Sequence, residues 1–293
     1  MFKKNIDNKT FNKHLVSVHL AVFLFGSAGL FGKLLPISPF IIVFGRVFFA
    51  AIALFLFKLG KSCRCYQISL GNLPKFVLLG FVLAVHWVTF FTAIQVSTVA
   101  VGLITFSTFP IFVAFMEPFF FKRRLMTADI LFSLIAFMGV ILIIPEYSLE
   151  NRIFEGAVWG TISGLTFAIL SILNKKYVIN FSSTYVAFYQ NIFASVFLLP
   201  FLFLNFASLE IKHLILLIIL GVIFTALSHS FFIFGLKKIT AATASIIAVL
   251  EPFYGIILAA VFLQEIPNLR TIGGGALILS VVVFKTHLEM KKK

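Results

Sequence analysis

Two stretches of the sequence, Thr98–Pro110 (TVAVGLITFSTFP) and Thr240–Pro252 (TAATASIIAVLEP), decide how the whole chain is interpreted. Both begin with threonine, run through small and apolar residues, and reach a proline at the same spacing. They lie 142 residues apart, which is close to half of the 293-residue chain. An internal repeat decides the architecture of a chain. We therefore expect two copies of one unit, divided as residues 1–147 and 148–293.

Weaker matches between the two halves agree with this division. Both repeated stretches follow an apolar run with a Leu-Gly pair near its beginning, and both continue as an apolar run after the proline. The first apolar run of each half also carries an aromatic–glycine–hydroxyl motif. The matched pairs are Leu79-Gly80 with Leu220-Gly221, Phe90-Phe91 with Phe232-Ile233, and Phe25-Gly26-Ser27 with Trp159-Gly160-Thr161.

The composition places these units in a membrane. Hydrophobic residues make up 61% of the chain and charged residues 12%, and phenylalanine alone occurs 40 times. A typical soluble domain is about 45–50% apolar and about 25% charged, so neither a soluble fold nor a disordered chain fits. The net charge of +14 comes from short clusters of Lys and Arg between long uncharged runs. That pattern is typical of membrane proteins and does not indicate a nucleic-acid partner.

Ten runs are long and apolar enough to cross a bilayer, which takes about 20 residues of helix. We expect an all-α integral membrane protein, with the first run retained as a helix and not removed as a signal peptide. The last run is the least clear, because charges flank it and three glycines lie inside it. The runs are Leu15–Leu34, Phe40–Phe57, Phe76–Ile94, Val99–Phe121, Ala128–Ile144, Gly156–Leu173, Thr184–Phe206, Leu214–Phe234, Ala241–Leu263 and Leu269–Thr286.

The charged linkers give the expected orientation. Lys and Arg concentrate in the N-terminal segment and in every second linker after it, and few lie in the others. By the positive-inside rule, both termini face the cytoplasm of a bacterial-type inner (plasma) membrane. Cys63 and Cys65 then fall in a reducing compartment, where two thiols without a nearby His make a poor metal site.

The two halves should run through the membrane in opposite directions. Each half holds five runs, and five is odd, so the second half enters from the opposite side. Inverted repeats are a common plan of secondary transporters, whose binding site lies near the midplane between the halves. The sequence therefore predicts a transporter of small molecules, although duplication can also stabilise a bundle of another function.

The chain resembles the EamA-type proteins of the drug/metabolite transporter superfamily over nearly its whole length. The resemblance is carried by Leu250-Glu251-Pro252-Phe253, Phe262-Leu263-Gln264-Glu265 and Gly273-Gly274-Gly275, and in the first half by Pro110 and Gly139-Val140. It implies ten helices in two repeats. The first half departs where the family often has Glu, because Lys122-Arg123-Arg124 stands there and Glu117 is not equivalent. The family moves amino acids, nucleotide-like metabolites, drugs and sugars, so the resemblance leaves the substrate open.

Two charged residues inside the expected spans are the first candidates for substrate contact. A charge at the bilayer centre costs about 2.5–3.5 kcal/mol on insertion scales. Glu251 shares a helical face with Tyr254, and either binds a cationic group or a coupling proton, or serves as a structural hydrogen-bond partner. Arg46 either holds a substrate carboxylate bidentately, or turns toward the interface or a helix end.

Uncharged polar and aromatic residues complete the candidate site. Gln190 and Asn191 occupy the place in the second half that matches Arg46, and either line the cavity or bridge helices. His86 and Trp87 lie at the centre of one run, and His229 lies in another. A His can relay protons near neutral pH, and Trp can wall a cavity, but either can also be a packing residue. Glu265, at an outer helix end, is a candidate for an external gate.

Other chemistry has no support in the sequence. No Walker-type loop, HExxH pattern or GxSxG elbow is present, so we expect no catalytic residues, no cofactor and no metal. We expect the substrate to be a small polar or amphipathic metabolite, and amino acids are the leading candidates. A coupling proton or cation, the direction of transport and the oligomeric state stay open. The alternatives are an intramembrane enzyme, a passive channel, and a receptor or assembly factor.

Overall fold

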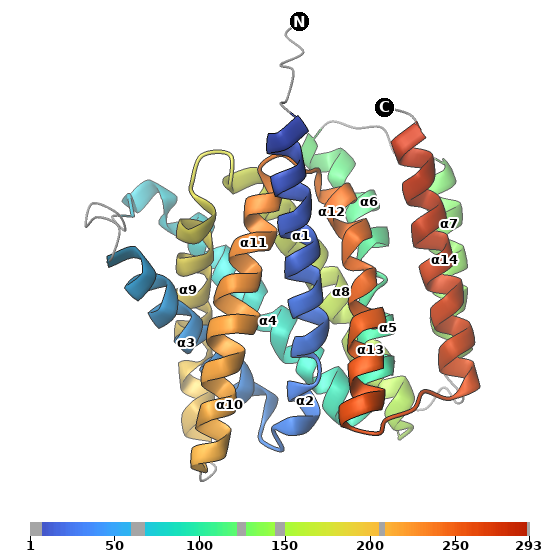
Figure 1. Cartoon of the computed structure of the whole chain (residues 1–293), viewed down its shortest axis with the longest axis horizontal. Helices are drawn as coiled ribbons and strands as arrows, with labels where there is room; N and C mark the ends of the chain where they lie inside the picture. Colours follow the sequence, from blue (N-terminus) through green and yellow to red (C-terminus); the bar gives the residue numbers. More distant parts are fainter. Residues whose placement is uncertain (1–7, 60–67, 122–126, 144–149, 205–208, 292–293) are drawn as a thin grey trace, which may run out of the picture.

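The computed structural model describes residues 8–59, 68–121, 127–143, 150–204 and 209–291. Within these ranges the chain is helical and contains no strand. The helices run up and down beside one another, and α1 (Asn8–Ala28) begins at the same end of the molecule at which α14 (Leu269–Lys291) ends (Figure 1). We call this end the upper end, after its place in Figure 1, and the opposite end the lower end.

Each half of the chain forms a series of helices joined by short segments. In the first half, α1 is followed by α2 (Phe31–Leu34), α3 (Pro39–Leu59), the short η1 (Leu70–Asn72), α4 (Leu73–Val96), α5 (Val99–Phe106), α6 (Phe109–Phe121) and α7 (Thr127–Ile143). In the second half they are α8 (Arg152–Tyr177), α9 (Ser183–Leu204), α10 (Ile211–Gly221), the π-helical η2 (Val222–Leu227), α11 (Ser228–Leu236), α12 (Ala241–Ala248) and α13 (Leu250–Phe262).

Among the residues that the structure describes, eight helical stretches are long and apolar enough to cross a membrane, so the protein is a multi-pass membrane protein. They correspond to the first four predicted runs and to the sixth through ninth. The fifth run falls on α7, which is 17 residues long, and the tenth on α14, whose apolar part covers Leu269–Val281. Ten spans therefore remain a prediction, whereas the all-helical class is confirmed for the described residues.

The two repeated stretches fold in the same way. In each, the threonine hydroxyl caps a helix: Val101 N–H donates to Thr98 Oγ1 at 3.0 Å, and Thr243 N–H donates to Thr240 Oγ1 at 3.1 Å. The capped helices, α5 and α12, have equal lengths and lie 142 residues apart.

Both capped helices also end for the same reason. Proline has no N–H to bond the carbonyl four residues back and clashes with it. Helix α5 ends at Phe106, four residues before Pro110, and α12 ends at Ala248, four residues before Pro252. Pro252 therefore breaks the second capped helix in the same way as Pro110 breaks the first.

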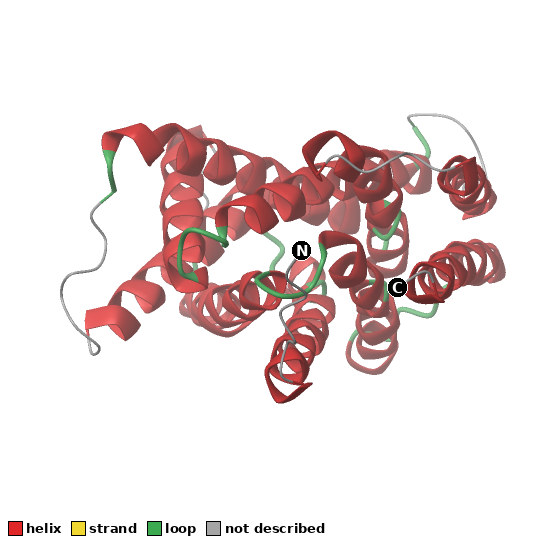
Figure 2. Cartoon of the chain, turned by 90° about the horizontal axis from the view of Figure 1, so that it is seen from above, coloured by secondary structure: helices red, strands yellow, loops and turns green. Residues whose placement is uncertain are grey.

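The helices pack as two bundles, and the first helix of each half packs in the bundle that the other half forms. Bundle A contains α4, α5 and α6 from the first half together with α8 from the second. Bundle B contains α10, η2, α11, α12 and α13 from the second half together with α1 from the first. Helices α3 and α9 pack on each other, α9 also on α4 and α3 also on α10 and η2. The pair α7 and α14 lies at one edge of the molecule (Figures 1 and 2).

Glycine brings α1 and α13 into close contact within bundle B. A Cβ placed on Gly26 would lie 2.6 Å from the backbone oxygen of Glu251, and one placed on Gly255 would lie 2.9 Å from the oxygen of Gly26. Only a residue without a side chain fits such a crossing. The crossing fixes the start of α13, where Glu251 lies, against the C-terminal end of α1.

Candidate functional site

Arg46 lies on α3 with none of its surface exposed, and two elements hold its guanidinium. The guanidinium carbon lies 3.4 Å from the centroid of the Trp87 ring on α4, a cation–π contact. On the other side, Nε donates to Thr225 Oγ1 at 3.0 Å, and Nη2 donates to the backbone oxygen of Phe224 at 3.2 Å. Arg46 thus points into the protein between bundle A and bundle B, and not toward lipid.

The π-helical segment η2 presents the two partners of Arg46. Thr225 Oγ1 donates to the carbonyl of Leu220, five residues back, at 2.8 Å. A π-turn widens the helix and changes which carbonyls remain available to outside donors, and such turns are frequent at functional sites. Here the widened turn offers a hydroxyl and a carbonyl oxygen to one buried guanidinium.

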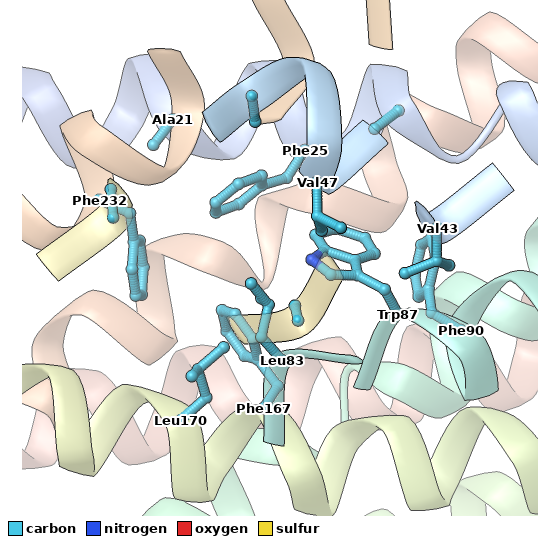
Figure 3. Packing of buried hydrophobic residues seen from close by; sticks show 14 of the residues in the cluster. Ala21, Phe25, Val43, Val47, Leu83, Trp87, Phe90, Phe167, Leu170 and Phe232 are labelled. Carbon is cyan, nitrogen blue, oxygen red and sulfur yellow. The ribbon is translucent and has the colours of Figure 1, made fainter. Parts of the chain in front are cut away.

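Aromatic rings surround the Trp87 indole, which is 2% exposed. Figure 3 shows the indole between Phe25 of α1, Val47 of α3 and Phe90 of α4. The ring of Phe25 meets Trp87 edge-on at 6.4 Å and His229 edge-on at 5.2 Å. These rings make the surroundings of Trp87 mostly apolar, and only a few polar atoms lie among them, as in the binding pockets of small molecules.

Gln190 of α9 and His229 of α11 meet across the centre of the molecule. Gln190 Nε2 lies 3.2 Å from His229 Nδ1, and the His229 ring lies 5.8 Å from Trp87. Gln190 has none of its surface exposed, and His229 has 3%. This contact joins α9, which packs on bundle A, to α11 of bundle B.

Glu251 is the second residue of α13, directly after the break at Val249. Only 1% of its surface is exposed. Its carboxyl group lies within electrostatic range of the Arg46 guanidinium. The broken helix thus places a buried carboxyl group near the guanidinium, at the start of α13.

Each of these five residues keeps a buried polar atom that has no hydrogen-bond partner within the described protein. Such an atom costs about 1–3 kcal/mol when it stays unpaired. Two of the atoms are donors, two are acceptors, and the His nitrogen takes either role. The cluster can therefore pair with a molecule that carries both an anionic and a cationic group. The atoms are Arg46 Nη1, Trp87 Nε1, Gln190 Oε1, His229 Nε2 and Glu251 Oε2.

The other three predicted residues have contacts of their own. His86 is buried beside Trp87, with ring centroids 4.6 Å apart, and its Nδ1 lies 3.0 Å from Ser163 Oγ. Asn191 donates to the carbonyl of Ala187 on its own helix at 2.7 Å, and its buried Oδ1 has no hydrogen-bond partner within the described protein. Tyr254 is half-buried, and its ring meets that of Phe23 on the outer part of α1 at 5.4 Å.

Thr225, Phe224 and Phe25 contact the cluster but are not among the predicted site residues. Thr225 could have been selected as a hydroxyl one helical turn before His229. The sequence does not indicate the role of the Phe224 carbonyl, because its availability depends on a π-turn. It also does not indicate the role of the Phe25 ring, because its direction depends on how α1 is rotated. Within the described residues, no group of three or more His, Cys, Asp or Glu side chains could hold a metal. Cys63 and Cys65 lie outside the described residues.

A chain of long apolar helices around a buried, polar and partly charged centre is the architecture of a membrane transport protein. Comparison with known families agrees, because the EamA-like transporter family matches residues 13–144 and again residues 154–286. The chain belongs to this family. The resemblance expected from the motifs around Glu251 and Glu265 is therefore confirmed.

Individual relatives and a solved structure extend the comparison. A protein of Bacillus subtilis named "Uncharacterized transporter YxxF" is 26% identical over 92% of this chain and 88% of its own. An "S-adenosylmethionine uptake transporter" of Rickettsia felis is 26% identical over 87% of this chain and 85% of its own. One crystal structure of a protein superposes with a TM-score of 0.72 at 13% identity, covering 96% of this chain and 99% of that one. That likeness concerns the fold alone.

Proposed function

We propose that this protein is a secondary transporter that carries a small polar or amphipathic metabolite by alternating access. The observation that carries the proposal is the buried cluster of Arg46, Trp87, Gln190, His229 and Glu251 between the two bundles. A site at the contact of two packed units opens to one side or the other when the units tilt. The same side chains then serve as one site with two entrances.

The substrate we favour carries an α-amino acid group. A carboxylate would accept from Arg46 Nη1 and Trp87 Nε1, and an amine would donate to Glu251 and Gln190. Charge-assisted hydrogen bonds of this kind are the strongest available in a buried site. S-adenosylmethionine, which gives one relative its name, also carries an α-amino acid group and so belongs to the same chemical class.

We further propose that the two halves are inverted copies in a plasma membrane, with both termini in the cytoplasm. The equal caps at Thr98 and Thr240, and the equal breaks before Pro110 and Pro252, support the repeat. The exchange of α1 and α8 between the bundles supports a two-fold relation of the halves. The positive-inside pattern supports the orientation, with the upper end in the cytoplasm.

Transport of the substrate in purified vesicles tests this function. The protein is reconstituted in proteoliposomes, and a panel of labelled amino acids, S-adenosylmethionine, nucleosides and sugars is offered in uptake and counterflow. We expect counterflow of at least one compound with an α-amino acid group. Flux without counterflow would favour a passive channel, and conversion of a compound without movement would favour an intramembrane enzyme.

Glu251 also offers a place for a coupling proton. If its carboxyl group carries the proton, the variant Glu251→Gln exchanges substrate across the membrane but no longer accumulates it in response to a pH gradient. The matched control is Asn180→Asp, which adds a carboxyl group at an exposed position beyond the end of α8. An unchanged pH dependence in Glu251→Gln would exclude proton coupling through this residue.

A further inference from the structure

Two lysines that lie 142 residues apart make the same contact at opposite ends of the molecule. At the lower end, Lys33 Nζ donates to the backbone oxygens of Gln95 at 3.4 Å and Ser97 at 2.7 Å. At the upper end, Lys175 Nζ donates to the oxygens of Leu236 at 2.6 Å and Ile239 at 2.9 Å. Each lysine thus caps the carbonyl end of a helix, where a positive charge is favourable.

The exchange of first helices makes both contacts run between the bundles. Lys33 lies on α2, which continues α1 of bundle B, and caps α4 of bundle A. Lys175 lies on α8 of bundle A and caps α11 of bundle B. If the bundles tilt apart at the lower end, the contact of Lys33 with α4 must break. If they tilt apart at the upper end, the contact of Lys175 with α11 must break.

An acidic residue, Glu265, adds a second bond between the bundles at the lower end. Glu265 Oε1 accepts a hydrogen bond from Val99 N–H, at the start of α5, at 2.7 Å. Gln264, which precedes it, has a φ of 55°, and this left-handed turn at the end of α13 sends Glu265 back toward α5. Its charge attracts that of Lys33. The short turn between α4 and α5 is therefore bonded to bundle B at both of its ends.

We propose that Lys33, with Glu265, and Lys175 are the latches of two gates, one at each end of the molecule. The inference rests on the alternating-access mechanism proposed above. With both latches formed, the side chains of the central cluster are shut off from both ends, in agreement with their exposure of at most 3%. Release of one latch opens one end and leaves the other latch to hold the bundles together.

Distances between spin labels at the two ends test this directly. Cys63 and Cys65 are first replaced by serine, and exposed positions of the two bundles are changed to cysteine in pairs. The lower pair is Val158 of α8 and Ile211 of α10, and the upper pair is Ile179, just beyond α8, and Lys238, just beyond α11. Labels on the reconstituted protein are measured by double electron–electron resonance, without added substrate.

Each latch variant should affect its own end. In Lys33→Met and Glu265→Gln, the lower distance lengthens or broadens while the upper distance stays. In Lys175→Met, the upper distance changes and the lower one stays. Lys33→Arg, which keeps charge and donors, restores the original lower distance, and the control Lys176→Met, at the exposed neighbour of Lys175, changes neither. If both latch lysines leave both distances unchanged, or alter the same one, the inference is overturned.

The outcome can be separated from that of the proposed function, because the labels report without any substrate. If the two ends open independently but no compound of the panel shows counterflow, the transport proposal fails and the latches stand. If counterflow is found while neither distance responds, the latches fail and transport stands. A variant that elutes as aggregate in size-exclusion chromatography is replaced by its glutamine form, Lys33→Gln or Lys175→Gln, and judged by the same distances.

Discussion

Arg46 is the residue on which most of the site depends, since it contacts α4 by stacking and η2 by two hydrogen bonds. A guanidinium can do both because it is flat and carries donors in several directions. Lysine has the same charge but offers a point-like ammonium group on a flexible stem.

We therefore expect Arg46→Lys to impair transport even though it conserves the charge. Loss of a desolvated cation–π contact, worth about 2 kcal/mol, should lower uptake at least about tenfold. Uptake and substrate affinity are measured in proteoliposomes, with Ile52→Leu, at an exposed position of the same helix, as the control. Wild-type affinity in Arg46→Lys would show that the guanidinium does not contact the substrate.

All five residues of the cluster are site candidates in the sequence, and their contact with a substrate stays a prediction, whereas the partners of Arg46 on η2 are not sequence candidates. Arg46, Glu251 and His229 stand out because a charged or polar residue inside an apolar run needs a reason to be there. Asn191 and Tyr254 meet the same criterion, and in the structure Asn191 donates to its own backbone while the Tyr254 ring contacts the exposed Phe23 of α1. Which face of a helix points inward depends on how it is rotated by its neighbours, and a single sequence does not contain that information.

At the scale of the helices, α1 and α13 can cross closely because Gly26 and Gly255 carry no side chain at the crossing. We expect Gly26→Ala to destabilise the protein by about 1–3 kcal/mol, because the added Cβ meets a backbone oxygen that cannot rotate away. The change is measured as a lower melting temperature in detergent. Gly71→Ala is the matched control, because the nearest atom to its added Cβ is Ser69 Oγ at 4.0 Å. Equal melting temperatures for both variants would mean that the crossing relaxes freely.

Helix breaks were predictable and the π-helix was not. The break before Glu251 follows from the chemistry of Pro252, whose missing N–H can be read from the sequence alone. The segment η2 contains Val222–Leu227, which are apolar residues and one threonine, with no proline or glycine. Its contacts with Arg46 of α3 exist only in the folded protein, and no sequence pattern indicates them.

At the scale of the whole molecule, the proposed orientation makes a prediction about sidedness. Reporter proteins that are active only in the cytoplasm should be active when fused before Met1 or after Lys293. The same reporter should be inactive when fused after Leu209, in the loop before α10 at the lower end. Alkaline phosphatase, which is active only outside the cytoplasm, gives the reciprocal control. Opposite activities at the two termini would rule out the predicted inverted arrangement.

The five unpaired polar atoms at the centre also bear on the rates of the transport cycle. A transporter that only exchanges substrates always crosses loaded, whereas net transport requires it to return unloaded. In the loaded crossing, the substrate pairs atoms such as Arg46 Nη1 and Glu251 Oε2, while in the unloaded crossing each unpaired atom adds about 1–3 kcal/mol to the closed state. Under the proposed mechanism, we therefore expect the unloaded return to be the slow step, so that exchange is faster than net transport.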